Sequence, residues 1–335
     1  MTRSRGGAPA PAFTYADGVR LARAPLWFDA PRVRESVVVS HAALGVPGRR
    51  ARAIATPATQ ALLAALRGRT AILDDALVVP CHQPVTLGAL RLELIPSGYL
   101  LGAASCLVEA FGQAVLYAGT INPTPGPLAE PAEARPATAV AIDGCFADPR
   151  RAFPPRASVE ADLAEFAALG VAAGGTPVVL ASALTVAPDL AATLAAAGFA
   201  VRAHPRILRA CAALRAGGAP VPPVARFTGQ TAPGEVLLWP EDAPLDRARP
   251  RLRAPRVGWV SPWAAVPGVR PPVCERRFAL ATDPDYRHLR DYLARTHAKD
   301  VFLLRGRAAA VEALRAEGLR VHLLGPPRQM ELFPA

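Results

Sequence analysis

The chain has 335 residues, of which 51% are hydrophobic, so it is long enough to bury a sizeable core, and this composition excludes wholesale disorder. Its 38 cationic side chains outnumber 27 acidic ones, giving a net charge of +11 that favours polyanionic partners or serves solubility. No apolar signal peptide precedes the first strand, and no Cys-x-x-Cys pair occurs, which predicts a cytoplasmic protein without a disulfide framework. The five cysteines are Cys81, Cys106, Cys145, Cys211 and Cys274.

The first third of the chain predicts strands with short connections. Ser36–Ser40 is typical of a buried strand, and Thr56-Pro57 predicts the start of a helix that runs to about Arg67. Further β-rich stretches are predicted over 85–95, 104–109 and 114–117, followed by a proline-rich loop over 123–136 and a strand over 139–142.

The middle of the chain alternates strands and helices, which is the pattern of a small parallel sheet. Helices are expected over 158–169, 188–197 and 205–215, with strands over 177–182, 199–203 and 235–239. Because the most apolar stretch, 176–201, contains Pro188 and Asp189, it predicts a strand and a helix rather than a membrane span. No membrane partner is therefore expected.

The last part predicts a return to the first unit. A linker over 242–256 precedes strands over 256–260, 300–304 and 319–324 and helices over 284–296 and 306–317. The simplest organisation is a first part over 1–150, an inserted α/β domain over 151–255, a completing part over 256–324 and an exposed tail over 325–335.

Several short sequence segments, spread along the chain, resemble the metal-binding motifs of a known family. Ser40–Val46 stands where the family has Ser-His-x-His-x-Asp-His, and Pro96–Ala104 stands where it has Pro-x-Gly-His-x-x-Gly-Ser-Ala. Its Ser-Gly-Asp corresponds to Ala118–Thr120, its Glu-Ala-Thr-Phe-Gly to Asp143–Ala147, its Ser-Asp-His-Ala-Asp to Ala281–Asp285 and its His-Gly to Arg305-Gly306. The chain resembles, from about 26 to 324, the β-CASP branch of the metallo-β-lactamase fold, most nearly the bacterial exonuclease associated with DNA ligase and related to mRNA 3′-end processing factors. This resemblance implies an α/β fold, namely a metallo-β-lactamase-like αββα sandwich with an inserted β-CASP-like parallel α/β domain.

The family's chemistry needs two divalent metals, and this sequence lacks most of their ligands. Of the first motif only His41 remains, and the other ligand positions carry Ala43, Gly45, Val46, Tyr99, Thr120, Asp283 and Arg305. Arg305 would place a permanent cation where the family has an imidazole. The resemblance therefore predicts no catalytic residues and no cofactor.

A rebuilt site that binds one zinc or manganese ion is the alternative. Its candidate ligands are His41, Asp143, Asp283 and Asp285, with His82 as a further one. The simpler interpretation is structural, with His41 at a strand end, Asp283 as the N-cap of the helix after Pro284, and Asp285 in its first turn. Cys145 follows a strand end, but without an identifiable partner histidine it is interpreted as a structural thiol.

The last residues contain a short peptide of a known kind. Gln329-Met330-Glu331-Leu332-Phe333 resembles the Gln-Leu-x-Leu-Phe peptide that binds the bacterial β sliding clamp. Met330, Leu332 and Phe333 would fill an apolar groove and Gln329 would hydrogen-bond at its rim. In the alternative interpretation, these side chains fold back onto the last strand.

These observations predict a catalytically inactive relative of the ligase-associated exonucleases that binds nucleic acid, DNA rather than RNA, as a repair or replication accessory. Arg305 is the candidate phosphate contact, together with clusters at 32–34, 49–52 and 276–277. The alternatives are a divergent metal-dependent nuclease or hydrolase, and a scaffold for other proteins without a role on nucleic acid.

Overall fold

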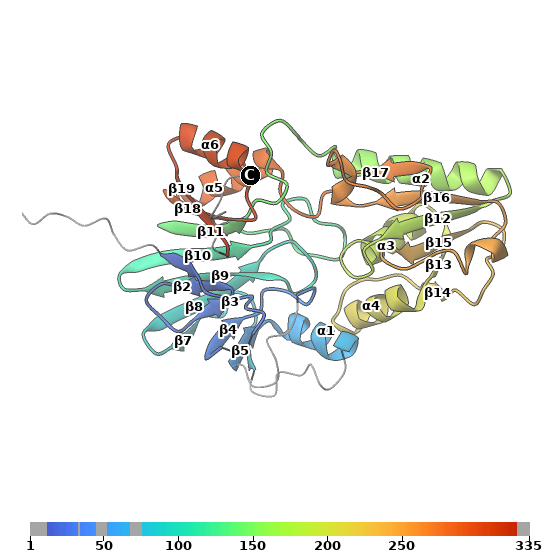
Figure 1. Ribbon diagram of the computed structural model, residues 1–335. Helices are drawn as coiled ribbons and strands as arrows, with labels where there is room; N and C mark the ends of the chain where they lie inside the picture. The colour runs from blue at the N-terminus through green and yellow to red at the C-terminus, as the bar shows by residue number, and fades with distance from the viewer. Residues whose placement is uncertain (1–11, 33, 45–51, 68–75, 327–335) are drawn as a thin grey trace, which may run out of the picture.

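The computed structural model describes residues 12–32, 34–44, 52–67 and 76–326, which form a mixed α/β fold with three sheets (Figure 1). The N-terminal sheet has six strands in chain order, antiparallel from the first to the third and parallel from there on. Its strands are β1 (Phe13–Tyr15), β2 (Val19–Leu21), β3 (Trp27–Phe28), β4 (Ser36–Val38), β5 (Arg52–Ala55) and β6 (Leu77–Val78). The strand predicted over 36–40 is therefore present, but it ends at Val38.

The central sheet has seven strands in the order β19-β18-β11-β10-β9-β8-β7. They are β7 (Val85–Leu87), β8 (Leu90–Pro96), β9 (Ala104–Ala110), β10 (Gln113–Gly119), β11 (Ala139–Asp143), β18 (Asp300–Leu304) and β19 (Arg320–Leu324). The β-rich stretch over 85–95 is a hairpin because Gly88, with a φ of 60° that favours glycine, turns the chain between β7 and β8. From β10 to β19 the pairing is parallel.

The N-terminal and central sheets pack face to face around aromatic side chains. The ring of Phe13 lies 6.0 Å from that of Phe28 in its own sheet and 5.5 Å from that of Phe302 in the central sheet. Buried apolar residues of α1 (Pro57–Arg67) cover the outer face of the N-terminal sheet, and those of α5 (Tyr286–Thr296) and α6 (Ala308–Ala316) cover the outer face of the central sheet. The layers therefore run helix, sheet, sheet, helix (Figure 1).

The third sheet has six strands in the order β14-β13-β15-β12-β16-β17, and every pairing is parallel. They are β12 (Thr176–Ala181), β13 (Ala200–Ala203), β14 (Ala225–Arg226), β15 (Glu235–Pro240), β16 (Pro255–Val260) and β17 (Arg276–Phe278). This sheet and its helices α2 (Arg156–Ala172), α3 (Ala187–Ala196) and α4 (Pro205–Ala216) lie beside the first two sheets, with α4 against α1 (Figure 1).

The boundary expected at residue 255 is wrong, because β16 and β17 belong to the third sheet. The Pro/Arg-rich stretch over 242–256 leaves this sheet and returns to it, so that Arg256, which was expected to begin the completing part, pairs with Pro177 of β12. The inserted unit therefore extends to Phe278. None of the helices within the described residues is both long and apolar enough to cross a membrane.

Candidate functional site

A cavity of about 430 Å³ opens where parallel strands of the first two sheets end. His41 follows β4, Thr120 follows β10, Asp143 is the last residue of β11 and Arg305 follows β18, and all four line this cavity. Because β10, β11 and β18 run parallel in one sheet, their carboxyl ends meet at one edge, and β4 brings His41 to it from the facing sheet.

The structure places most of the positions that were aligned with family metal ligands in this one cavity. They are His41, Ala43, Tyr99, Thr120 and Arg305, whereas Gly45 and Val46 lie outside the described residues. Asp143, a candidate ligand of the rebuilt site, lines the cavity with them. Asp283 is not among the lining residues, although its charge acts on Tyr99.

The carboxylate of Asp143 is held by an arginine. Asp143 is buried and forms an ion pair with the guanidinium of Arg305, whose side chain is 61% exposed. Its second oxygen accepts a hydrogen bond from the backbone N–H of Cys145 at 2.8 Å. Arg305 adopts a φ of 52°, a conformation that non-glycine residues rarely hold without a reason, so the loop presents this cation to the cavity at some cost in strain.

A network around Asp29 joins the two sheets at the cavity, and the sequence did not indicate it. Asp29 accepts hydrogen bonds from Ser40 N at 2.8 Å, Ser40 Oγ at 2.6 Å and the Tyr117 hydroxyl at 2.8 Å. Burial, with the charge of Asp29, raises the pKa of Tyr117 well above its usual value, so this hydroxyl stays protonated. Asp29 follows β3, whose two residues are too few to show a periodic pattern.

His41 is buried beside this network, and its Nδ1 has no hydrogen-bond partner among the described residues. Its ring lies 4.6 Å from that of Tyr99. Burial lowers the pKa of His41, and Arg305 lowers it further, whereas the charge of Asp29 acts in the opposite direction. The imidazole is therefore neutral at neutral pH.

The roles expected of Asp283 and Asp285 need a correction. Helix α5 begins at Tyr286, and its N-cap is Asp285, whose carboxylate accepts the N–H of His288 at 3.0 Å and, across the chain, that of Phe153 at 3.0 Å. Asp283 is buried ahead of the cap and accepts the Thr282 hydroxyl at 2.6 Å. Burial raises the pKa of Asp283 to about 6.

The described residues do not fit the two-metal centre of the family that the sequence resembles. Asp143 is paired with a permanent cation, and Asp285 is committed to backbone N–H groups. His82 is not at the cavity and lies 3.2 Å from Glu133 and 3.9 Å from Glu93. Within the described ranges no three His, Cys, Asp or Glu side chains gather in a way that could hold a metal ion.

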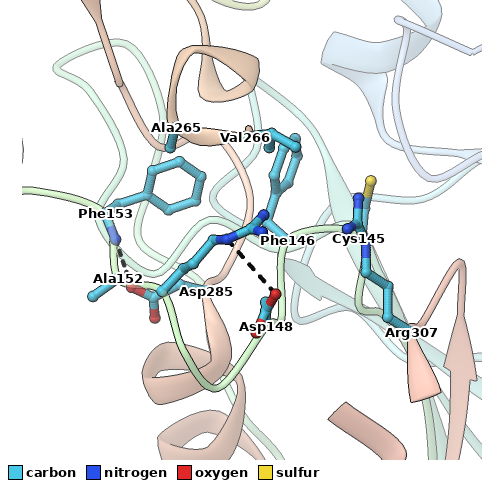
Figure 2. Close-up of a pocket in the computed structure, with 10 residues that line it drawn as sticks. Cys145, Phe146, Asp148, Ala152, Phe153, Ala265, Val266, Asp285 and Arg307 are labelled. Atoms are coloured by element: carbon cyan, nitrogen blue, oxygen red, sulfur yellow. Dashed lines mark hydrogen bonds and ion pairs between the residues drawn. The ribbon is translucent and has the colours of Figure 1, made fainter. Parts of the chain in front are cut away.

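A second, smaller pocket lies beyond Asp143 along the chain (Figure 2). Cys145, Phe146 and Arg307 line it together with Phe153 and the capping Asp285. Burial and the charge of Asp283 raise the pKa of Cys145. A thiol held protonated is a poor nucleophile, which agrees with the structural interpretation of Cys145.

The arginine clusters are partly neutralised where they are described. Arg32 and Arg34 each lie 3.3 Å from Asp17, and Arg276 lies 3.0 Å from Asp162. Residues 49–51 of the second cluster lie outside the described residues, as does the clamp-like peptide Gln329, Met330, Leu332 and Phe333. Among the candidate cations that the structure describes, Arg305 is the one that lines the cavity, where it pairs with Asp143.

Comparison with known proteins gives one finding that bears on this site. The chain is 28% identical, over 323 residues, to a protein of Opitutus terrae named "Probable DNA ligase". The match covers 95% of this chain but 31% of that protein, so the chain spans about a third of the length of the relative. No protein-family model matches the chain.

Proposed function

We propose that this chain binds nucleic acid, DNA rather than RNA, as an accessory in DNA repair or replication. The observation that carries the proposal is the exposed guanidinium of Arg305 in the cavity at the carboxyl ends of the strands. Phosphate groups are the ligands that such a cation prefers. The likeness to a protein named as a DNA ligase, and the net charge of +11, support the same class of ligand.

We also propose that the chain is a distant member of the β-CASP branch of the metallo-β-lactamase fold. The layer order helix, sheet, sheet, helix and the parallel third sheet inserted within it support this proposal. So does the meeting, in one cavity, of six positions that were aligned from separate motifs: His41, Ala43, Tyr99, Thr120, Asp143 and Arg305.

In this proposal the cavity binds nucleic acid without cleaving it. Arg305 takes the carboxylate of Asp143 as its partner, which leaves a cation where hydrolysis would need a metal ligand. Purified protein is therefore expected to hold no stoichiometric zinc or manganese by mass spectrometry and to leave DNA intact when either ion is added. Stoichiometric metal, with cleavage that is lost in Asp143→Ala or Asp283→Ala but kept in Asp291→Ala, would instead establish the divergent nuclease.

The binding proposal is tested by titrating labelled DNA at several salt concentrations. Arg305→Gln is expected to weaken binding and to reduce the salt slope by about 1, as for one lost phosphate contact. Arg290→Gln is the matched control, because Arg290 is an exposed arginine on α5 that pairs with Asp291 at 3.0 Å. Equal slopes for Arg305→Gln and the wild type would remove Arg305 from the interface. Absence of salt-dependent binding by the wild type would favour the protein scaffold.

We propose further that Gln329–Phe333 binds the β sliding clamp. Micromolar affinity, about −8 kcal/mol, is expected of such a peptide. Phe333→Ala should abolish clamp binding by the full chain, whereas Glu331→Ala should retain it because Glu331 occupies the variable position of the motif. Clamp binding that survives Phe333→Ala would show that another surface is responsible.

A further inference from the structure

Trp263 is the most exposed of the four tryptophans. It lies on a 3₁₀ turn, Pro262–Ala265, that directly follows β16, and it is 40% exposed. Trp239 and Trp259 are buried at 8% and 4%, and Trp27 is half-buried. An exposed indole is a large apolar surface that binding can use.

The ring of Trp263 belongs to a cluster that joins the two parts of the molecule. It lies 4.8 Å from the ring of Phe146, which in turn lies 5.6 Å from that of Phe153. Phe146 comes three residues after Asp143, which lines the cavity. Figure 2 shows Phe146 and Phe153 in the second pocket, with Val266 and Ala265 from the segment that carries Trp263.

Cations line the pocket and the cavity on either side of Asp143. Arg307 lines the same pocket as Phe146, is exposed, and has no ion-pair partner among the described residues. Two residues before it, Arg305 lines the cavity. The second pocket has a volume of about 20 Å³, room for about one water molecule and not for a base. A ligand therefore has to lie across the exposed face of the cluster.

We propose that Trp263 is a stacking platform for an unpaired base, and that the ligand of this site is single-stranded nucleic acid. Single strands are bound where bases stack on exposed aromatic rings while cations of the same surface hold the phosphates. Ala265 and Val266, from the segment that carries Trp263, line one pocket with Arg307. A duplex buries the faces of its bases in its own stack. This inference rests on the proposed function and adds to it the strand form of the ligand.

The experiment follows the binding of a short labelled single strand, and of the same sequence as a duplex, to the full chain by anisotropy. Trp263→Ala is expected to weaken binding of the single strand by about 5- to 140-fold, the loss of one stacked base, and to leave duplex binding unchanged. Trp263→Phe should retain most of the affinity. The matched control is Trp27→Phe, at a ring half-buried between Arg20 and Arg34.

Tryptophan emission supplies a second readout that a purely structural role would not change. The single strand should quench the emission of the wild type and of Trp27→Phe, but not that of Trp263→Phe. Wild-type affinity in Trp263→Ala, together with weakened binding in Arg305→Gln, would overturn the stacking inference and leave the proposed function standing. Equal losses for single strand and duplex would also overturn it, and absence of any nucleic-acid binding by the wild type would overturn both.

Discussion

Two edges of this molecule are built alike, from the carboxyl ends of parallel strands, yet they differ in what their polar groups do. At the edge of the third sheet, β13 is followed by His204, whose Nδ1 accepts the N–H of Arg206 at 3.1 Å and so caps α4. Glu241 follows β15 and accepts the indole N–H of Trp259 at 2.6 Å. Each of these two side chains stabilises the fold locally.

At the edge of the first two sheets, the polar groups converge on a cavity instead. Nδ1 of His41 has no partner among the described residues, and the Asp143–Arg305 pair faces the open space. Asp29 and Arg305 hold φ values of 50° and 52°, whereas neither His204 nor Glu241 has a positive φ. A parallel edge alone therefore does not identify a site; the open cavity, the ion pair that faces it and the strained backbone beside it distinguish the edge of the first two sheets.

The largest effect on stability is expected for substitution of Asp29. Asp29→Ala removes the acceptor of three hydrogen bonds, from Ser40 N, Ser40 Oγ and the buried Tyr117 hydroxyl. We expect the free energy of unfolding to fall by about 3–5 kcal/mol, since each buried donor that is left without an acceptor costs about 1–3 kcal/mol. Urea denaturation measures the change.

Two matched variants sharpen this test. Asp29→Asn keeps one acceptor and tolerates a left-handed φ, so it should cost less than Asp29→Ala. Asp17→Ala removes an exposed acid that pairs with Arg32 and should change stability by less than about 1 kcal/mol. A loss of similar size in Asp17→Ala and Asp29→Ala would contradict the view that Asp29 holds the two sheets together at the cavity.

Asp283, whose charge acts on the cavity residue Tyr99, offers a change of opposite sign. Burial raises its folded pKa to about 6, above the ordinary 3.8. The stabilising contribution of the protonated form is thus complete below pH 3.8 and is lost as the pH rises through about 6. Asp283→Asn, which stays neutral, should therefore stabilise the protein by about 2–3 kcal/mol at pH near 8 and change little at pH near 4.

Urea denaturation of Asp283→Asn at both pH values measures this effect. Asp291→Asn serves as the control, because Asp291 is an exposed acid on α5 and should show no such pH-dependent gain. A destabilised Asp283→Asn at alkaline pH would mean that the charged carboxylate has a partner that favours it, which would revive the metal-bound alternative.

The sequence predicted the elements with clear periodicity and missed those without it. The alternating strands and helices of the third sheet were predicted correctly up to β15 except for β14, whose two residues carry no pattern. Strands β1 to β3 have two or three residues each, too few for a pattern. The helix after Pro284 was found, but its N-cap was misassigned, since Asp283 and Asp285 are both good capping residues and the start of a helix is the least certain part of its pattern.

The sequence predicted single residues of the candidate site that belong to local motifs, but it did not predict the contacts between residues far apart in the chain. Asp143 and Arg305 were each singled out, but their ion pair spans 162 residues, and only the pairing of β11 with β18 brings them together. The hydrogen bond between Asp29 and Tyr117 spans 88 residues and joins two sheets. Trp263 lies in a short 3₁₀ turn and matches no motif, so nothing in its sequence neighbourhood distinguishes it from a core tryptophan.

The smallest effect on stability is expected for substitution of His204, at the carboxyl edge of the third sheet. Its pKa is lowered by burial and by Arg206 and Arg209, so above pH 6.5 the neutral Nδ1 caps α4. His204→Ala should cost about 1 kcal/mol near pH 8, whereas His204→Asn should cost less because asparagine is a good N-cap. The sign follows from the lowered pKa: the contribution of the cap is present above pH 6.5 and is lost as the pH falls through the folded pKa, where protonated Nδ1 becomes a donor.

Urea denaturation of His204→Ala and the wild type should therefore give curves that converge in acid. DNA binding should be unchanged in His204→Ala, because β15 and β12 separate β13, which His204 follows, from β16, whose end carries Trp263. If His204→Ala weakened DNA binding as Arg305→Gln is expected to, the ligand would also contact the far part of the third sheet, and the distinction drawn between His204 and the polar groups of the cavity would fail. Unchanged binding with a lost cap would instead confine the interface to the edge where Asp143 and Arg305 meet and to the adjoining turn that carries Trp263.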